Sequence, residues 1–110
     1  MTEPIYDVDD DTLLLAEELS DELDVRLLAF KNKKKDISVL DMGAGNGYLG
    51  FEAFKKKGIQ VTLVDKNKDA IENLSMIVES EDLNMSVIES DLFENVPEKK
   101  YDVIVFNTPY

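Results

Sequence analysis

With 110 residues, 24 of them acidic and 12 basic, the chain carries a formal net charge of -12, and it has neither cysteine nor histidine. This length fits one domain. The acidic balance argues against a nucleic-acid partner, because lysine and arginine bind phosphates. Without cysteine and histidine, a disulfide framework, a zinc site and a histidine base are excluded, so no metal is expected. No apolar run approaches the roughly 20 residues of a membrane span, and the acidic N-terminus lacks the apolar core of a signal peptide, so we expect a cytoplasmic protein without membrane contact.

The first element that the sequence predicts is a helix over residues 12–31. Leucines recur there at steps of four, at Leu15, Leu19, Leu23 and Leu27, which is the spacing of one helical face. Three acids at 9–11 precede this stripe, where a helix cap and first-turn acids belong. The stretch KNKKKD that follows is typical of a solvated loop.

Apolar runs and helical patterns alternate over the rest of the chain. The predicted strands span residues 37–42, 59–65, 84–90 and 101–107, and the predicted helices span 48–57 and 68–80. A connection interrupted by Pro97 joins the third strand to the fourth. Strands that alternate with crossovers indicate an α/β fold, with a parallel sheet and helices on its faces.

A glycine-rich turn links the first strand to the helix after it. Its glycines, Gly43, Gly45 and Gly47, allow a tight turn close to a ligand, and the helix N-terminus beyond offers N–H groups to an anionic group. Residues 45–50 match the G-x-G-x-x-G pattern of dinucleotide-binding proteins. However, Asp41 stands at the strand tip before them, where it would repel a pyrophosphate. An acid there suits a ligand with an ammonium group, such as the methionyl end of S-adenosylmethionine.

Acids stand at the tips of three successive predicted strands. Besides Asp41, Asp65 ends the second strand, where a carboxylate can accept both hydroxyls of a ribose. Asp91 follows the third strand, where it could accept from an adenine amino group while Leu92 packs against the ring. We therefore expect a nucleoside-containing ligand at this edge.

The lysines are placed at the opposite edge. Those at 33–35, 55–57 and 99–100 precede strands, so they are expected at the amino ends of the sheet. Only Lys66 and Lys68 lie near the strand tips. The ligand edge is therefore predicted to be acidic and poorly suited to a nucleic-acid backbone.

The tetrapeptide Asn107-Thr108-Pro109-Tyr110 follows the fourth predicted strand. An asparagine side chain and the next backbone carbonyl can both accept from a planar –NH2 group, a tyrosine ring can pack on that group, and proline holds the turn. Such a clamp would orient an amide or exocyclic amine for in-line attack on a sulfonium methyl group. Positioning supplies most of this effect, so no strong base is required.

Together these motifs resemble the class I S-adenosylmethionine-dependent methyltransferases of the N-P-P-Y group, which methylate planar nitrogen. The matching stretches are VLDMGAGNGYLG, LVD, SDLF and VFNTPY, in this order. The opening EPIYDVDDDTLLLAEEL resembles that of the archaeal and eukaryotic HemK-related enzymes, which methylate the glutamine of a Gly-Gly-Gln motif in class I release factors. The resemblance implies the N-terminal part of a Rossmann-like three-layer sandwich, with parallel strands in the order 3-2-1-4. It also implies a single methyltransferase domain over 1–110, with a Rossmann-like core at 37–110.

The resemblance further implies S-adenosylmethionine as the cofactor, with S-adenosylhomocysteine as the product. The residues expected to bind the cofactor are Tyr6, Thr12, Asp41, Gly43, Gly45, Gly47, Asp65, Lys66, Asp91, Leu92 and Asn107. The residues expected to hold the methyl acceptor are Asn107, Thr108, Pro109 and Tyr110. Thr108 stands where the family has the first of two prolines, and it can supply the same backbone carbonyl.

Two edges of the predicted sheet suggest protein partners. The resembling family has seven strands, and only four are recognisable here, so strand 101–107 would be an exposed apolar edge that invites pairing. We therefore hypothesise a fragment or one piece of a split enzyme, which self-associates or takes a complementing chain. The other edge, strand 84–90, is where a small zinc-ribbon activator pairs in the resembling enzymes.

Three other functions remain open at this point. An adenine-N6 nucleic-acid methyltransferase uses the same clamp, because its substrate also presents a planar amine. A non-catalytic S-adenosylmethionine-binding fragment would carry the cofactor residues without activity. An NAD-binding module is opposed by the position of Asp41 before the glycines.

Overall fold

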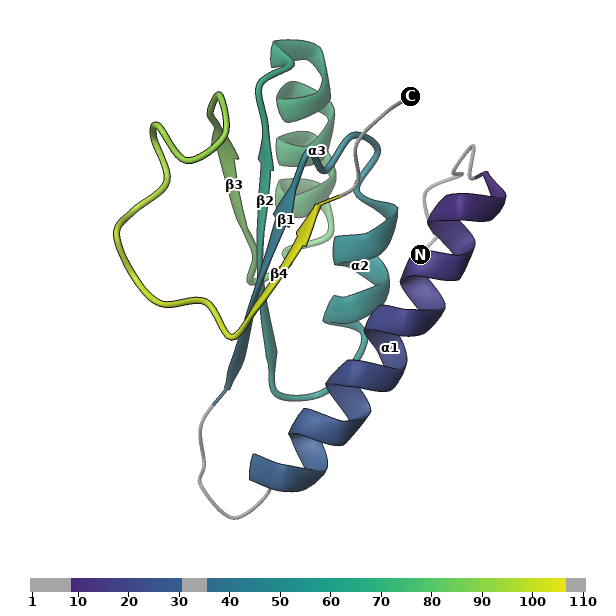
Figure 1. The fold of residues 1–110 in the computed structure, drawn as a ribbon. Helices are drawn as coiled ribbons and strands as arrows, with labels where there is room; N and C mark the ends of the chain where they lie inside the picture. Colours follow the sequence, from purple (N-terminus) through teal and green to yellow (C-terminus); the bar gives the residue numbers. More distant parts are fainter. Residues whose placement is uncertain (1–8, 31–35, 107–110) are drawn as a thin grey trace.

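The computed structural model describes residues 9–30 and 36–106, which form a sheet with helices packed on it (Figure 1). In chain order the elements are α1 (Asp10–Phe30), β1 (Ile37–Met42), α2 (Tyr48–Phe54), β2 (Ile59–Asp65), α3 (Lys68–Ser80), β3 (Ser86–Glu89) and β4 (Val103–Phe106). This order matches the prediction. Within the described ranges, no helix combines the length and the apolar character that a bilayer crossing requires.

Helix α1 begins at Asp10, two residues before the predicted start. Asp9 is the reason, because its Oδ1 accepts the Thr12 N–H at 2.7 Å and its carbonyl accepts the Leu13 N–H at 3.1 Å. These bonds satisfy N–H groups that a helix start otherwise leaves unpaired. The predicted leucine stripe faces inward: Leu19 and Leu23 are buried, and Leu15 and Leu27 pack against the same core.

All four strands are parallel, in the predicted order β3-β2-β1-β4. β1 is central: Asp41 lies opposite Leu63 of β2 on one side and Val105 of β4 on the other. Strands buried on both faces read as nearly continuous apolar runs, which explains the composition of β1 and β2. β3 and β4 are the two edges of the described sheet.

Alternate residues of the strands pack on opposite faces of the sheet. All three helices lie on one face, and their core includes Leu23, Leu49 and Leu74 together with Val39 and Leu63 (Figure 1). The other face carries a smaller cluster. Its buried members are Leu40, Met42 and Val64, and Ile88, Val96 and Tyr101 pack against them. Here the connection between β3 and β4 supplies the cover, and no helix lies in it.

A polar contact aligns β4 with β1. The Asp102 carboxylate accepts the Ser38 N–H at 2.9 Å, and the Asp102 N–H donates to the Ser38 carbonyl at 2.9 Å. These two residues are far apart in the sequence, so their bonds set the register where β4 enters the sheet.

Three elements are shorter than predicted. α2 ends at Phe54 instead of residue 57, because the chain turns toward Gly58, whose φ of 84° lies in the left-handed region that favours glycine. β3 spans Ser86–Glu89 instead of 84–90, and β4 starts at Val103 instead of 101. In both strands the shorter span coincides with the residues that pair with the neighbouring strand.

Candidate functional site

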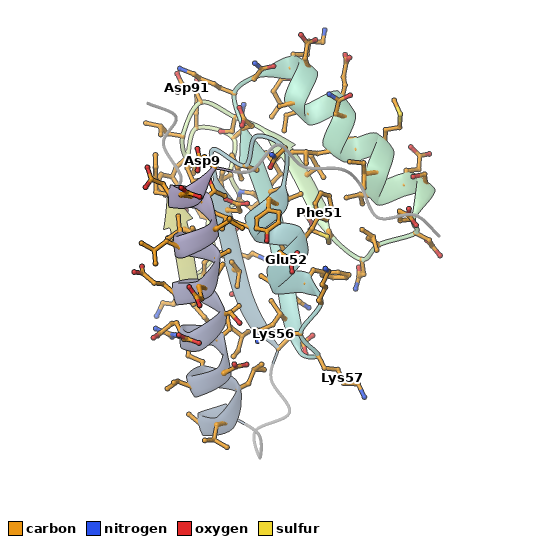
Figure 2. The ribbon with its side chains drawn as sticks, turned by 90° about the vertical axis from the view of Figure 1, so that its right-hand side faces the viewer. Asp9, Phe51, Glu52, Lys56, Lys57 and Asp91 are labelled. Carbon is orange, nitrogen blue, oxygen red and sulfur yellow. The ribbon has the colours of Figure 1, made fainter. Side chains whose placement is uncertain are left out.

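The carboxyl ends of β1, β2 and β3 bring three acids to one edge of the sheet. Asp41 is the second-to-last residue of β1, Asp65 ends β2, and Asp91 lies just past β3. Ligands of open parallel α/β sheets bind at this edge. Figure 2 shows Asp91 near one end of the molecule and Lys56 and Lys57 toward the other, as the sequence predicts.

The glycine loop uses its backbone donors within the protein. The N–H groups of Gly43 and Ala44 donate to the Val64 carbonyl at 2.8 and 2.9 Å, and the Gly47 N–H donates to the Ala44 carbonyl at 2.9 Å. The N–H of Tyr48, the first residue of α2, donates to the Asn46 side chain at 3.0 Å. A phosphate cradle needs such donors to be free. The expectation that this loop and helix start offer N–H groups to an anion is therefore wrong at these positions.

Asp65 ties the glycine loop to the tip of β2. Its Oδ2 accepts the Gly45 N–H at 2.8 Å, and its Oδ1 accepts the Asn67 N–H at 2.9 Å. Asn67 in turn caps α3 by accepting from two N–H groups of the first turn. Each carboxylate oxygen can accept more than one hydrogen bond, so the expected ribose contact remains compatible with these bonds.

Asp41 is a buried carboxylate, only 1% exposed. Neither of its oxygens has a well-formed hydrogen bond to the described residues, and the Gly50 N–H is the one backbone donor that acts on this carboxylate. Burial raises the pKa of Asp41 to about 7; the Gly50 N–H opposes this shift and the Asp65 carboxylate adds to it. The site therefore holds two neighbouring acids, one of them a buried acceptor without a well-formed hydrogen bond, which favours a cationic ligand over an anionic one. Because both oxygens are covered, a direct contact with a ligand requires the loop above to shift.

Two glycines make room for close packing around α2, Gly47 against α3 and Gly50 against the sheet. A Cβ atom at Gly47 would collide with the Phe51 ring and with Leu74, and its φ is 85°. A Cβ atom at Gly50 would collide with Leu63 and come within 3.3 Å of Asp41 Oδ2. Gly47 was predicted as a site residue, whereas the role of Gly50 in covering Asp41 was not. A glycine on the buried side of a short helix is the signal that could have indicated it.

The segment after β3 is held by side chains that the sequence reasoning missed. Ser90 is 3% exposed; its Oγ donates to the Leu92 carbonyl at 2.8 Å and accepts the Asn95 N–H at 2.9 Å. Asp91 and Leu92, predicted to contact an adenine, are exposed at this turn, and Leu92 has a φ of 54°. The signal was a serine at a strand end with an asparagine five residues later, since both residues bond to nearby backbone.

Of the other residues predicted for the site, Thr12 and Lys66 lie within the described ranges. The Thr12 N–H bonds to Asp9, as the cap of α1 requires. Lys66 is exposed just past the end of β2. Tyr6 and the clamp at 107–110 lie outside the described residues, so their predicted roles stay predictions.

A separate cavity of about 570 Å³ lies between α1 and α2. Leu13, Ala16, Tyr48 and Leu49 line it, together with charged residues that include Glu52 and Lys56. Figure 2 shows Glu52 and Lys56 beside α1, away from Asp91. None of the three strand-tip acids lines this cavity, so it is distinct from the predicted ligand edge.

Comparison with known proteins bears on the family and the fold of the chain. A profile of the methyltransferase small domain matches residues 6–110. The chain belongs to the methyltransferase small domain family. The predicted relationship to HemK-related methyltransferases is confirmed, as is the Rossmann-like fold with strand order 3-2-1-4.

Relatives within and around this family differ in their substrates. A protein of Methanocaldococcus jannaschii, assigned as a protein N5-glutamine methyltransferase, is 36% identical over 106 residues, which are 96% of this chain. The release factor glutamine methyltransferase of Streptococcus pneumoniae is 31% identical over 102 residues, or 92% of this chain. Among solved structures, the T. thermophilus 16S rRNA N2 G1207 methyltransferase, in complex with AdoMet and guanosine, superimposes with a TM-score of 0.73 at 30% identity over 94% of this chain.

The chain spans less than half of the length of each of these proteins. It covers 47% and 36% of the two relatives and 26% of the solved structure's chain.

Proposed function

We propose that the chain is the S-adenosylmethionine-binding domain, over residues 1–110, of an N-methyltransferase that modifies the glutamine of a Gly-Gly-Gln motif in a class I release factor. Bound S-adenosylmethionine would supply a methyl group on sulfur, which passes to the amide nitrogen while the C–S electron pair stays on sulfur to leave S-adenosylhomocysteine. The residues of this chain bind the cofactor and orient the acceptor, and the displaced amide proton goes to solvent.

The buried Asp41 carboxylate is the observation that best supports this cofactor. It lies beside the glycine loop without a partner among the described residues, and Asp65 raises its pKa further. The ammonium and sulfonium groups of S-adenosylmethionine would reduce the repulsion between these acids. A dinucleotide pyrophosphate would increase it, and the loop donors that it needs are engaged.

In this proposal Asp65 accepts from the ribose hydroxyls, and Asp91 with Leu92 receives the adenine. Gly43, Gly45 and Gly47 shape the loop, with Tyr6, Thr12, Lys66 and Asn107 as further cofactor contacts. Asn107 to Tyr110 hold the methyl acceptor. Two relatives that carry this activity in their names support the choice of glutamine as the substrate.

An RNA nitrogen is the second candidate acceptor, because the T. thermophilus structure contains guanosine and has 30% identity to this chain. The strong negative charge of the chain weighs against it. The described lysines before β2 and β4 are placed at the amino ends of the strands, away from the ligand edge.

Calorimetric titration of the chain with S-adenosylmethionine and with NAD tests the cofactor. Binding of the first and not the second is expected; the reverse would overturn the proposal. Methyl transfer to a release factor and to a guanosine- or adenine-containing RNA then separates the acceptors. The Asn107→Ala variant is expected to lower transfer on the order of a hundredfold, because the amide loses its orientation. Unchanged transfer would contradict the clamp.

We also propose two protein contacts at the sheet edges. A small zinc-ribbon activator would add a strand at β3, whose outer edge is unpaired within the described residues. A second copy or a complementing chain would cover β4, where Ile104 and Phe106 are 50% and 48% exposed.

A further inference from the structure

We propose that Ser90 is a positioning residue that makes the site selective for an adenine base, by fixing the backbone turn that carries Asp91 and Leu92. This inference rests on the proposed function, because it assumes that these two residues receive the adenine of S-adenosylmethionine. Ser90 would touch neither the cofactor nor the methyl acceptor, and would act through the position of Asp91 and Leu92.

The Ser90 hydroxyl closes the turn from both sides. Its Oγ donates to the Leu92 carbonyl at 2.8 Å and accepts the Asn95 N–H at 2.9 Å. Ser90 is 3% exposed, so its hydroxyl has little access to water, although its partners Leu92 and Asn95 lie at the surface. A buried hydroxyl with two partners holds its neighbours more firmly than a solvated one, because breaking either bond leaves an unsatisfied polar group.

The turn adopts a conformation that requires such support. Leu92 has a φ of 54°, in the left-handed region that residues with a Cβ atom rarely occupy. Its carbonyl bonds to Ser90, and its side chain is 53% exposed at the ligand edge. The strained backbone needs the Ser90 bond to persist. The exposed leucine side chain leaves apolar surface in water, and a flat ring packed on it would cover that surface.

Ser90 also joins this turn to the ribose side of the site. Its N–H donates to the Asp65 carbonyl at 3.0 Å, so the residue expected to bind the ribose and the residue that closes the adenine turn are hydrogen-bonded neighbours. Asn95 completes the arrangement, since its side-chain amide donates to the Glu89 carbonyl at 3.2 Å. The spacing between ribose and base contacts is therefore set at Ser90.

The test compares two ligands that differ only in the base. S-adenosylhomocysteine presents an amino group to Asp91, whereas S-inosylhomocysteine presents a carbonyl oxygen. The unaltered chain is expected to prefer the first by about tenfold or more, because a mismatched acceptor facing a carboxylate is penalised. In the Ser90→Ala variant this preference should fall by about threefold to tenfold, which corresponds to the net value of a hydrogen bond.

Matched variants separate positioning from general stability. Ser86→Ala, on the exposed surface of β3, should leave the preference unchanged, and Ser90→Thr, which keeps the hydroxyl, should restore part of it. Adding Asp91→Ala to Ser90→Ala should cause little further loss, because both changes remove the same base contact. If Ser90→Ala does not fold, Asn95→Ala, which removes the side-chain bond to the Glu89 carbonyl in the same turn, should lower the preference in the same direction.

The outcomes distinguish this inference from the function on which it rests. Equal weakening of both ligands by Ser90→Ala, with the preference intact, would overturn the positioning role while the cofactor assignment stands. Additive effects of Ser90→Ala and Asp91→Ala would do the same. Failure of the unaltered chain to bind S-adenosylhomocysteine would overturn both.

Discussion

Asp41 combines burial with the absence of any hydrogen-bond partner among the described residues, a pairing that is costly for a charged group. Its pKa of about 7, against an ordinary value of 3.8, means that between these two pH values the folded protein holds a proton that the unfolded chain releases. A site that must attract a positively charged ligand can tolerate this cost, because the ligand relieves it.

The Asp41→Asn variant should change how stability depends on pH. Between pH 4 and 7 the folded chain binds more protons at Asp41 than the unfolded chain does, so the free energy of unfolding falls as pH rises through this range. The shift of about three units sets an upper limit of roughly 4 kcal/mol on the loss. Thermal melts of both proteins should therefore give a Tm difference in favour of the variant that is larger at pH 8 than at pH 5. A difference independent of pH would show that Asp41 ionises normally.

Binding of S-adenosylmethionine should also depend on Asp41. The cationic cofactor favours the ionised carboxylate, so affinity should rise severalfold between pH 6 and pH 8 in the unaltered chain. The Asn variant should show a flatter profile. Calorimetry in two buffers of different ionisation enthalpy would detect the proton released on binding, and its absence would contradict the coupling.

At the scale of elements, the approach of α2 to the sheet decides the shape of the site. The helix is only seven residues long, yet it covers Asp41 and carries the buried side chains Leu49, Phe51 and Ala53. Packing against the strands stabilises so short a helix, because isolated helices of this length are unstable. The glycine at position 50 permits that packing.

The Gly50→Ala variant should lower stability although alanine favours helices. Helix propensity alone predicts a gain of about 1 kcal/mol. The added methyl group would meet Leu63 and lie 3.2 Å from Val61 Cγ1, and overpacking of this kind costs about 1–3 kcal/mol. Urea denaturation should therefore give a net loss. Ser75→Ala, at an exposed position of α3, is the control that should stabilise slightly, and a gain at Gly50 as well would contradict the close approach.

At the scale of the whole molecule, the described sheet has a helical face and a face covered only by the connection to β4. On that second face Leu40 and Met42 are buried, whereas Ile104 and Phe106, which pair with them in register, are about half exposed. The apolar surface therefore continues onto β4 without cover from the described residues.

The 110-residue chain studied alone should self-associate through β4. An exposed apolar edge strand pairs readily with another chain. Light scattering should show an average mass that rises with concentration, and Ile104→Lys should reduce this rise. Leu14→Lys is the matched control, since Leu14 is 56% exposed on α1. An equal effect of both changes would show that the association depends on net charge and not on β4. A monomer at all concentrations would contradict the edge contact.

Much of the fold could be predicted because it follows from local patterns. The bounds of β1, β2 and α3 agree with prediction, since a glycine or asparagine marks one end of each and apolar periodicity fills the rest. The ends of α2 and β3 could not be predicted as well. The turn to the left-handed Gly58 sets the end of α2, and the residues that pair with β2 set the bounds of β3. Ser90 was missed for a similar reason: its partners become visible only when the turn after β3 closes.

By itself, the sequence determined the alternation of strands and helices, the family, and which acids follow which strands, since each of these depends on residues close together in the chain. Only the tertiary structure decided how those acids behave. The burial of Asp41, the bond from Gly45 to Asp65 and the link from Ser90 to Asp65 all join residues from different elements. A carboxylate takes its pKa and its hydrogen-bond partners from what surrounds it in space, and packing of α2 and the glycine loop on the sheet creates those surroundings.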